Sequence, residues 1–122
     1  MEQKILDLSF LYNLSGNDTV YIYDVITLFL DVVPAGVANL EELVANGEDY
    51  DAIHKQAHFL KSSAAIIKIK EVYDDLVRIV TLAREQREMD EIALRVKNLA
   101  SNFSEAMPLI LAERERCKPV VS

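Results

Sequence analysis

The sequence predicts an all-α fold, an antiparallel four-helix bundle with a short additional N-terminal helix. No glycine or proline occurs between Gly47 and Pro108, although hairpins and strand ends depend on such residues. Along four stretches, apolar residues recur at intervals of three and four, which is the spacing of one helix face. Such faces must be buried, and short connections favour antiparallel neighbours.

The first long helix is predicted between two sets of terminal signals, and residues 1–14 are expected to add the short helix across one end. Three favourable capping residues stand at its start, Asn17, Asp18 and Thr19. At its other end, Asn46-Gly47 tolerates the left-handed backbone that terminates helices. The face expected to be buried consists of Ile22, Ile26, Phe29, Val33, Val37, Leu40 and Val44.

Two prolines fall inside predicted helices. Because proline lacks a backbone donor and crowds the preceding turn, we expect Pro34 to cause a kink or short break near residues 31–35. The apolar spacing nevertheless continues across it. Pro108 is expected to kink or end the last helix.

Three further stripes predict the rest of the bundle. The second helix begins near Asp49 or Asp51, whose negative charge suits a helix start, and its stripe is Tyr50, Ile53, Ala57, Leu60, Ala64 and Ile67. The third stripe is Val72, Leu76, Ile79 and Ala83. A charged connector at residues 84–90 precedes the fourth, which is Ile92, Val96, Leu99, Phe103 and Ala106.

Length and composition predict one domain covering residues 1–122, with tails of about residues 1–6 and 116–122 expected to be disordered. Hydrophobic residues make up 51% of the chain, as in a folded globular protein. No uncharged apolar run approaches the roughly 20 residues of a membrane span, and residues 1–14 lack the regions of a secretory signal. The single Cys117 excludes an internal disulfide framework. These features predict a cytoplasmic protein.

The charge is unevenly distributed. A net charge of -7 argues against nucleic acid as a partner, because phosphate backbones are bound by concentrated Lys and Arg. Residues 52–70 contain no Asp or Glu but four lysines, Lys55, Lys61, Lys68 and Lys70. This segment is locally positive in an acidic chain, which by itself indicates no more than a solvated helix face.

His58 is the candidate for chemistry. At 100° per residue it lies about 130° from the centre of the apolar stripe of its helix, so we expect its side chain to face solvent. An exposed imidazole is mostly neutral at pH 7 and offers a ring nitrogen lone pair for attack on phosphorus. Lys61, one turn further on, is placed to offset the charge of an attached phosphoryl group. Ser62 is small and leaves room for a docking protein.

The segment Ala57-His58-Phe59-Leu60-Lys61-Ser62-Ser63-Ala64 resembles the signature of histidine-containing phosphotransfer (HPt) domains, and the resemblance extends over about residues 8–107. It implies a helical bundle that accepts a phosphoryl group on His58 from a receiver-domain aspartyl phosphate and passes it to another receiver, with Lys61 assisting. It further implies that the receiver supplies Mg²⁺, so the chain needs no cofactor, and that the chain is a phosphotransfer intermediate rather than an autonomous kinase.

Two positions depart from the family pattern. Ser62 stands where the family commonly has glycine, which adds one hydroxymethyl group to the docking surface. Residues 66–69 stand where the family commonly has a connection with glycine. Because Ile66-Ile67-Lys68-Ile69 contains no true breaker, an uninterrupted helix from Asp49 to Gln86 stays open as an alternative.

Receivers of a hybrid histidine kinase or response regulator are the expected partners. The residues expected to receive them surround His58, namely His54, Lys55, Phe59, Ser62, Ala65, Lys68 and Lys70. His54, four residues before His58, has the spacing of a metal-binding histidine pair, but two ligands are too few, so no metal site is predicted. The alternative function is a helical adaptor that binds a partner without chemistry, with His58 incidental.

Overall fold

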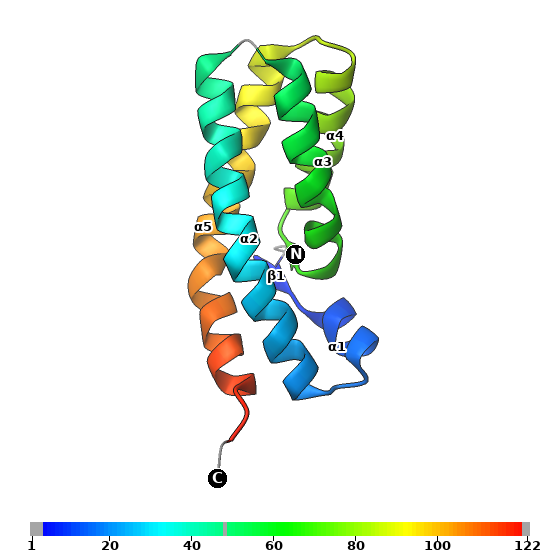
Figure 1. Ribbon diagram of the computed structural model, residues 1–122, viewed down its shortest axis with the longest axis vertical. Coiled ribbons are helices and arrows are strands. Elements are labelled where there is room, and N and C mark those ends of the chain that lie inside the picture. Colours follow the sequence, from blue (N-terminus) through cyan, green and yellow to red (C-terminus); the bar gives the residue numbers. More distant parts are fainter. Residues whose placement is uncertain (1–3, 48, 121–122) are drawn as a thin grey trace.

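Five helices and two short strands make up the computed structural model, which describes residues 4–47 and 49–120. In chain order they are β1 (Leu6–Asp7), α1 (Ser9–Ser15), α2 (Thr19–Asn46), α3 (Tyr50–Ile66), β2 (Lys68–Ile69), α4 (Val72–Arg84) and α5 (Met89–Cys117). In Figure 1, α2 to α5 run alternately up and down, and α1 lies beside the lower part of α2. The predicted antiparallel bundle with a short N-terminal helix is confirmed.

The core lies where the four predicted stripes meet. Each long helix packs against two others, α2 against α3 and α5, and α4 against α3 and α5. Every residue predicted to be inward in the third and fourth stripes is buried, as are all but Val44 in the first and Tyr50 in the second. Burying each large aliphatic side chain contributes about 1.5–3 kcal/mol, so these faces hold the bundle together.

A close approach of backbone to side chain sets the position of α3 on α2. Gly36 is buried in α2, and a Cβ atom added there would lie 2.7 Å from Cδ2 of Leu60 and 2.9 Å from Nε2 of Gln56. Only the absence of a side chain at Gly36 permits this spacing, because buried side chains leave little free volume. Beside it, Asn39 donates a hydrogen bond to Gln56 at 2.7 Å.

Capping side chains and a glycine set the ends of α2 and the start of α3. The carboxylate of Asp18 accepts hydrogen bonds from the backbone N–H groups of Val20 and Tyr21, which satisfies donors that a helix start leaves free. Gly47 ends α2 with a φ of 70°, and Asp49 caps α3 by accepting from the N–H of Ala52 at 2.9 Å. These predicted boundaries are confirmed.

Neither proline ends its helix. α2 continues past Pro34, and α5 continues past Pro108 to Cys117, so the short break expected at residues 31–35 and the helix end expected at Pro108 are wrong. An interior proline costs about 3 kcal/mol. Buried residues flank each proline and keep both helices in the core, Val33 and Val37 in α2 and Ala106 and Ile110 in α5.

The uninterrupted helix from Asp49 to Gln86 is also wrong, because a short sheet separates α3 from α4. Strand β2 pairs antiparallel with β1, with Leu6 opposite Ile69. The N–H of Lys70 continues this pairing by donating to the carbonyl of Ile5 at 2.9 Å. The chain then turns at Glu71, which has a left-handed φ of 62° and starts α4.

The segments next to the two termini are packed against each other. Leu6 belongs to β1, and Arg116 and Cys117 complete α5, although both regions were assigned to loose tails. The Tyr12 hydroxyl of α1 contacts Glu113, Arg116 and the buried Cys117 of α5. Residues 1–3 and 121–122 of the expected tails lie outside the described residues.

Among residues 4–47 and 49–120, α2 is the one helix long and apolar enough to cross a membrane by length and composition. A core helix of a bundle passes the same test. The apolar stripe of α2 is buried against α3 and α5, and 33% of the most apolar window of the helix is buried.

Candidate functional site

α3 displays His58 in its middle. The inward side of this helix is formed by Ile53, Ala57, Leu60 and Ala64, which are all buried, whereas the side chain of His58 is exposed. Exposure therefore agrees with the angle expected from helical geometry. The exposed side of α3 that carries His54, His58, Lys61, Ser62 and Ala65 is called the His58 face below.

The two histidines of this face lie against each other. The rings of His54 and His58 are stacked, with centroids 6.1 Å apart and planes at 9°. His54 is half-buried, whereas His58 is exposed. Within residues 4–47 and 49–120, no hydrogen bond or ion pair engages either imidazole, so their ring nitrogens are available to an incoming group.

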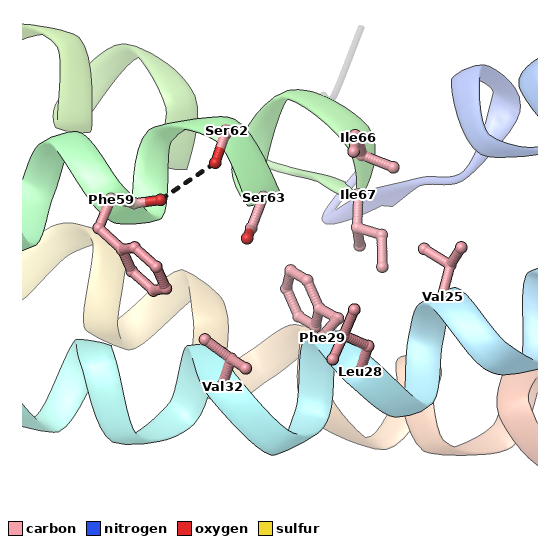
Figure 2. Close-up of a pocket in the computed structure, with 9 residues that line it drawn as sticks. All are labelled: Val25, Leu28, Phe29, Val32, Phe59, Ser62, Ser63, Ile66 and Ile67. Carbon is pink, nitrogen blue, oxygen red and sulfur yellow. Dashed lines mark hydrogen bonds between the residues drawn. The ribbon is translucent and has the colours of Figure 1, made fainter.

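Lys61 and Ser62 lie one turn beyond His58 toward the C-terminus of α3. Lys61 is half-buried and Ser62 is exposed. The Ser62 hydroxyl donates to the backbone carbonyl of Phe59 at 3.2 Å, as the dashed line in Figure 2 marks. The hydroxyl that replaces the family glycine is thus turned back onto its own helix. Ala65, one turn further, is half-buried.

The four lysines of the locally positive segment, residues 52–70, make different contacts. Lys55 makes an ion pair with Asp51 at 2.9 Å, and this hydrogen-bonded carboxylate raises the pKa of Lys55. The ammonium group of Lys68 lies over the Phe10 ring, 5.2 Å from its centroid. Lys70 is half-buried, and its carbonyl accepts from Asn102. Of the four, Lys61 alone belongs to the His58 face.

An apolar groove of about 240 Å³ lies beside the His58 face, between α2 and α3. Figure 2 shows Phe59 and Ser63 reaching from α3 toward Val32 and Phe29 on α2. Phe59 is 55% exposed and Leu28 is 65% exposed at its rim. The remaining lining residues are Val25, Ser62, Ile66 and Ile67.

The α2 side of this groove was missed by the sequence interpretation. Val25, Leu28 and Val32 lie next to the inward stripe of α2 and are only partly covered. Their apolar character at spacings of three and four was the available signal. It could not be used without knowing which helix packs beside α2, because that is a property of the tertiary structure.

Carboxylates and other metal ligands do not converge on the histidine pair. In the described part of the chain, no group of three or more His, Cys, Asp and Glu side chains is placed to hold a metal ion. The nearest acid along α3 in the N-terminal direction, Asp51, is engaged by Lys55. What the His58 face offers is therefore an accessible nitrogen nucleophile with a lysine and an apolar groove beside it.

Fold and site together define a helical-bundle protein that presents one histidine at the middle of an exposed helix face. The family model of the Hpt domain matches residues 24–107, which is more than half of the chain and includes all of α3 and α4. The chain therefore belongs to the Hpt domain family, whose members are phosphotransfer modules of phosphorelays. No curated protein and no solved structure matches the chain.

Proposed function

We propose that the chain is a phosphocarrier that accepts a phosphoryl group on His58 from the aspartyl phosphate of one receiver domain and passes it to another receiver. The observation that supports this role is the exposure of His58 in the middle of α3, inside the region that matches the Hpt family. The proposal treats residues 1–122 as one domain acting in the cytoplasm.

The transfer needs only a free ring nitrogen on this chain. The lone pair of the neutral His58 imidazole attacks phosphorus, the P–O bond to the receiver's aspartate breaks, and a P–N bond forms. The second ring nitrogen then releases its proton to solvent, and the receiver keeps a carboxylate. The return step to a second receiver reverses these bond changes.

Charge at the transferring group is balanced from both proteins. Lys61 lies one turn from His58 on the same face and offsets the charge of roughly -2 that phosphorylation adds. The acidic pocket of the receiver is expected to bring Mg²⁺, which neutralises the phosphoryl oxygens during transfer. This chain therefore contributes the nucleophile and one cation, and it needs no cofactor.

The groove between α2 and α3 provides the contact area for the receiver. Phe59 and Leu28 are large exposed side chains at its rim, and burying such groups is favourable in a protein interface. Ser62 and Ala65 are small and allow close approach to His58. His54, Lys55, Lys68 and Lys70 are proposed to contribute further contacts to the receiver, and the ion pair with Asp51 makes Lys55 less available for this.

The test mixes the chain with a phosphorylated receiver domain and follows acid-labile phosphate. The wild-type chain is expected to take up the label, His58→Gln to take up none, and His54→Gln, which keeps His58, to take up label still. Circular dichroism checks that each variant retains its helices.

Label that stays on the receiver with the wild-type chain, for each of several receivers, would contradict the proposal. In that case the chain would be a helical adaptor that binds a partner without chemistry. Label that persists on His58→Gln would assign the acceptor elsewhere.

A further inference from the structure

We propose that His54 is a positioning residue for the phosphorylated form of His58: in its protonated form it donates a hydrogen bond to the phosphoryl oxygens and prolongs the life of the phosphohistidine. The inference rests on the proposed function of His58. It goes beyond it because it assigns a role to a second imidazole and makes the stability of the phosphorylated state depend on pH.

Helix geometry directs the phosphoryl group toward His54. The Cα–Cβ bonds of an α-helix tilt toward its N-terminus, so a side chain covers the turn that precedes it. The side chain of His58 therefore leans over the turn that carries His54, and the stacked rings, 6.1 Å apart, show this directly. Lys61 leans back in the same direction, toward His58. A phosphoryl group on His58 is thus expected between a lysine and a histidine.

The closeness of the two rings supports this assignment. Their planes differ by 9° and their centroids are 6.1 Å apart, so the His54 ring is the neighbouring side chain on the N-terminal side of the His58 ring. Phosphorylation adds three strong acceptor oxygens just beyond the edge of the His58 ring. A protonated imidazole has two N–H donors, so the adjacent His54 ring can supply one to these oxygens.

The carboxylate nearest to His54 along α3 is already paired, so it competes less with a phosphoryl group for the His54 N–H. The acid on its own face, Asp51, is held by Lys55 at 2.9 Å, so this carboxylate is already paired. The antiparallel arrangement of α3 and α4 brings the C-terminal end of α4 to the same level as the first turns of α3 (Figure 1). Among the described residues, the charged side chains at these two helix ends are Asp49, Asp51 and Lys55 in α3 and Arg84 and Glu85 in α4. Lys61 lies one turn beyond His58.

On the other flank of α3, the surface toward α2 at this level has no acidic side chain among its described lining residues, and Lys55 is the charged residue there. It includes the hydrogen bond from Asn39 to Gln56, with Ala52 and Leu43 beside it. Among the described residues, the acids of the first turns of α3 that could compete with a phosphoryl group for His54 are therefore Asp49, which caps the start of α3, and Asp51. At the end of α4, Glu85 is paired with Arg87 at 2.8 Å.

Hydrolysis of phosphohistidine breaks the P–N bond, forms a P–O bond to water, and releases inorganic phosphate and the free imidazole. The transition state is loose, and the bonding electrons of the P–N bond leave with the imidazole nitrogen, so the phosphoryl group carries less negative charge than in the phosphohistidine. A cation that binds these oxygens therefore stabilises the ground state more than the transition state. From the usual strength of exposed charge pairs, we expect protonated His54 to slow hydrolysis about two- to fivefold.

The experiment loads the full chain with phosphoramidate, a small phosphodonor that needs no receiver, and follows the half-life of phosphorylated His58 by ³¹P NMR from pH 5.5 to 8.5. The wild type is expected to outlast His54→Gln about two- to fivefold near pH 5.5, with the two converging near pH 8.5. His54→Lys, which is cationic throughout, is expected to stay long-lived at both ends. Lys97→Gln on α5 controls for the loss of one exposed positive charge.

A half-life ratio between wild type and His54→Gln that stays at one across the pH range would overturn this inference. So would a short half-life for His54→Lys at every pH. Either result leaves transfer from receivers to His58 intact. Failure of receivers to label the wild-type chain would instead remove the proposed function, while the chemically loaded protein would still report on His54.

Discussion

Two polar regions of the bundle differ in how their charges are used. At the contact of α4 with α5, called the α4–α5 seam here, each carboxylate meets two partners. The Asp75 carboxylate accepts from Arg95 at 3.0 Å and from Asn98 at 2.7 Å, and Glu91 accepts from Arg78 at 2.9 Å and from Arg95 at 2.8 Å.

On the His58 face the arrangement is the opposite. The rings of His54 and His58 lie 6.1 Å apart and engage no charged group among the described residues. Buried polar groups must be satisfied within the fold, and Asp75 is only 4% exposed. Exposed groups have water as an alternative and can be left for a partner. The seam therefore serves stability, whereas the His58 face has the free groups that the proposed recognition and transfer require.

Breaking the seam is expected to have the largest effect on stability. Asp75→Ala leaves Arg95 and Asn98 without their buried acceptor and should lower the free energy of unfolding by about 2 kcal/mol. The quantity is measured by urea denaturation. Asp74→Ala, at the exposed neighbouring position, is the control and should change it by less than about 0.5 kcal/mol.

Phosphoryl uptake at His58 should be unchanged in Asp75→Ala under conditions where the variant is folded. Loss of uptake in the folded variant would show that the two regions are not separable as described.

Altering the groove is expected to separate recognition from stability. Phe59→Ser removes a ring that is 55% exposed, so the fold loses little, whereas binding of the receiver should weaken about tenfold. Leu94→Ser, at a leucine of α5 that is 68% exposed and lies away from the groove, is the matched control. Titration calorimetry with the receiver measures both, and equal affinities for the two variants would remove the groove from the interface.

A substitution of Glu71, at the start of α4, is expected to stabilise the fold by a smaller amount. Glu71 holds a left-handed φ of 62° without glycine's freedom, and a side chain costs about 1–2 kcal/mol in that region. Part of this is offset by the greater flexibility of glycine in the unfolded chain. Glu71→Gly is therefore expected to raise the free energy of unfolding by about 0.5–1 kcal/mol. Thermal unfolding measures the change. A melting temperature of Glu71→Gly below that of the wild type would contradict this explanation of the turn.

Lowering the pH should weaken the α4–α5 seam, because the Glu91 carboxylate becomes protonated. Hydrogen bonds from Arg78 and Arg95 lower the pKa of Glu91 from 4.5 to about 2. A carboxylate with a lowered pKa in the fold adds stability above its unfolded pKa and loses it as the pH falls toward the folded value. The free energy of unfolding should therefore fall between about pH 4.5 and 2, and by less in Glu91→Gln than in the wild type.

Asp75 changes the free energy of unfolding in the opposite direction. Burial raises the pKa of Asp75, so its protonation at low pH favours the folded state. Glu105→Gln, on an exposed part of α5, is the control. An unchanged acid dependence in Glu91→Gln would show that Glu91 does not carry this part of the stability.

Much of the fold could be predicted from local chemistry in the sequence. The capping carboxylates of Asp18 and Asp49 and the terminal Gly47 act within a few residues of themselves, so their neighbours along the chain are sufficient to identify them. The apolar stripes are also local patterns. The exposure of His58 followed from the stripe of its own helix, because the angle between them is fixed by helical geometry.

What could not be predicted depends on contacts between distant segments. The end of α3 is set by pairing of β2 with β1, about sixty residues away in the sequence, and by Glu71 in a conformation for which glycine is the usual signal. Pro34 and Pro108 remain helical because tertiary packing outweighs their local cost. The contact of Lys68 with the Phe10 ring of α1 likewise joins residues that are distant in the sequence.

The most direct test of the central claim is ³¹P NMR of the chain mixed with a phosphorylated receiver. The account predicts that the acyl phosphate resonance of the receiver declines while a phosphohistidine resonance grows, and that this new resonance is missing with His58→Gln. A resonance of inorganic phosphate alone, or a phosphohistidine resonance that survives in His58→Gln, would contradict it.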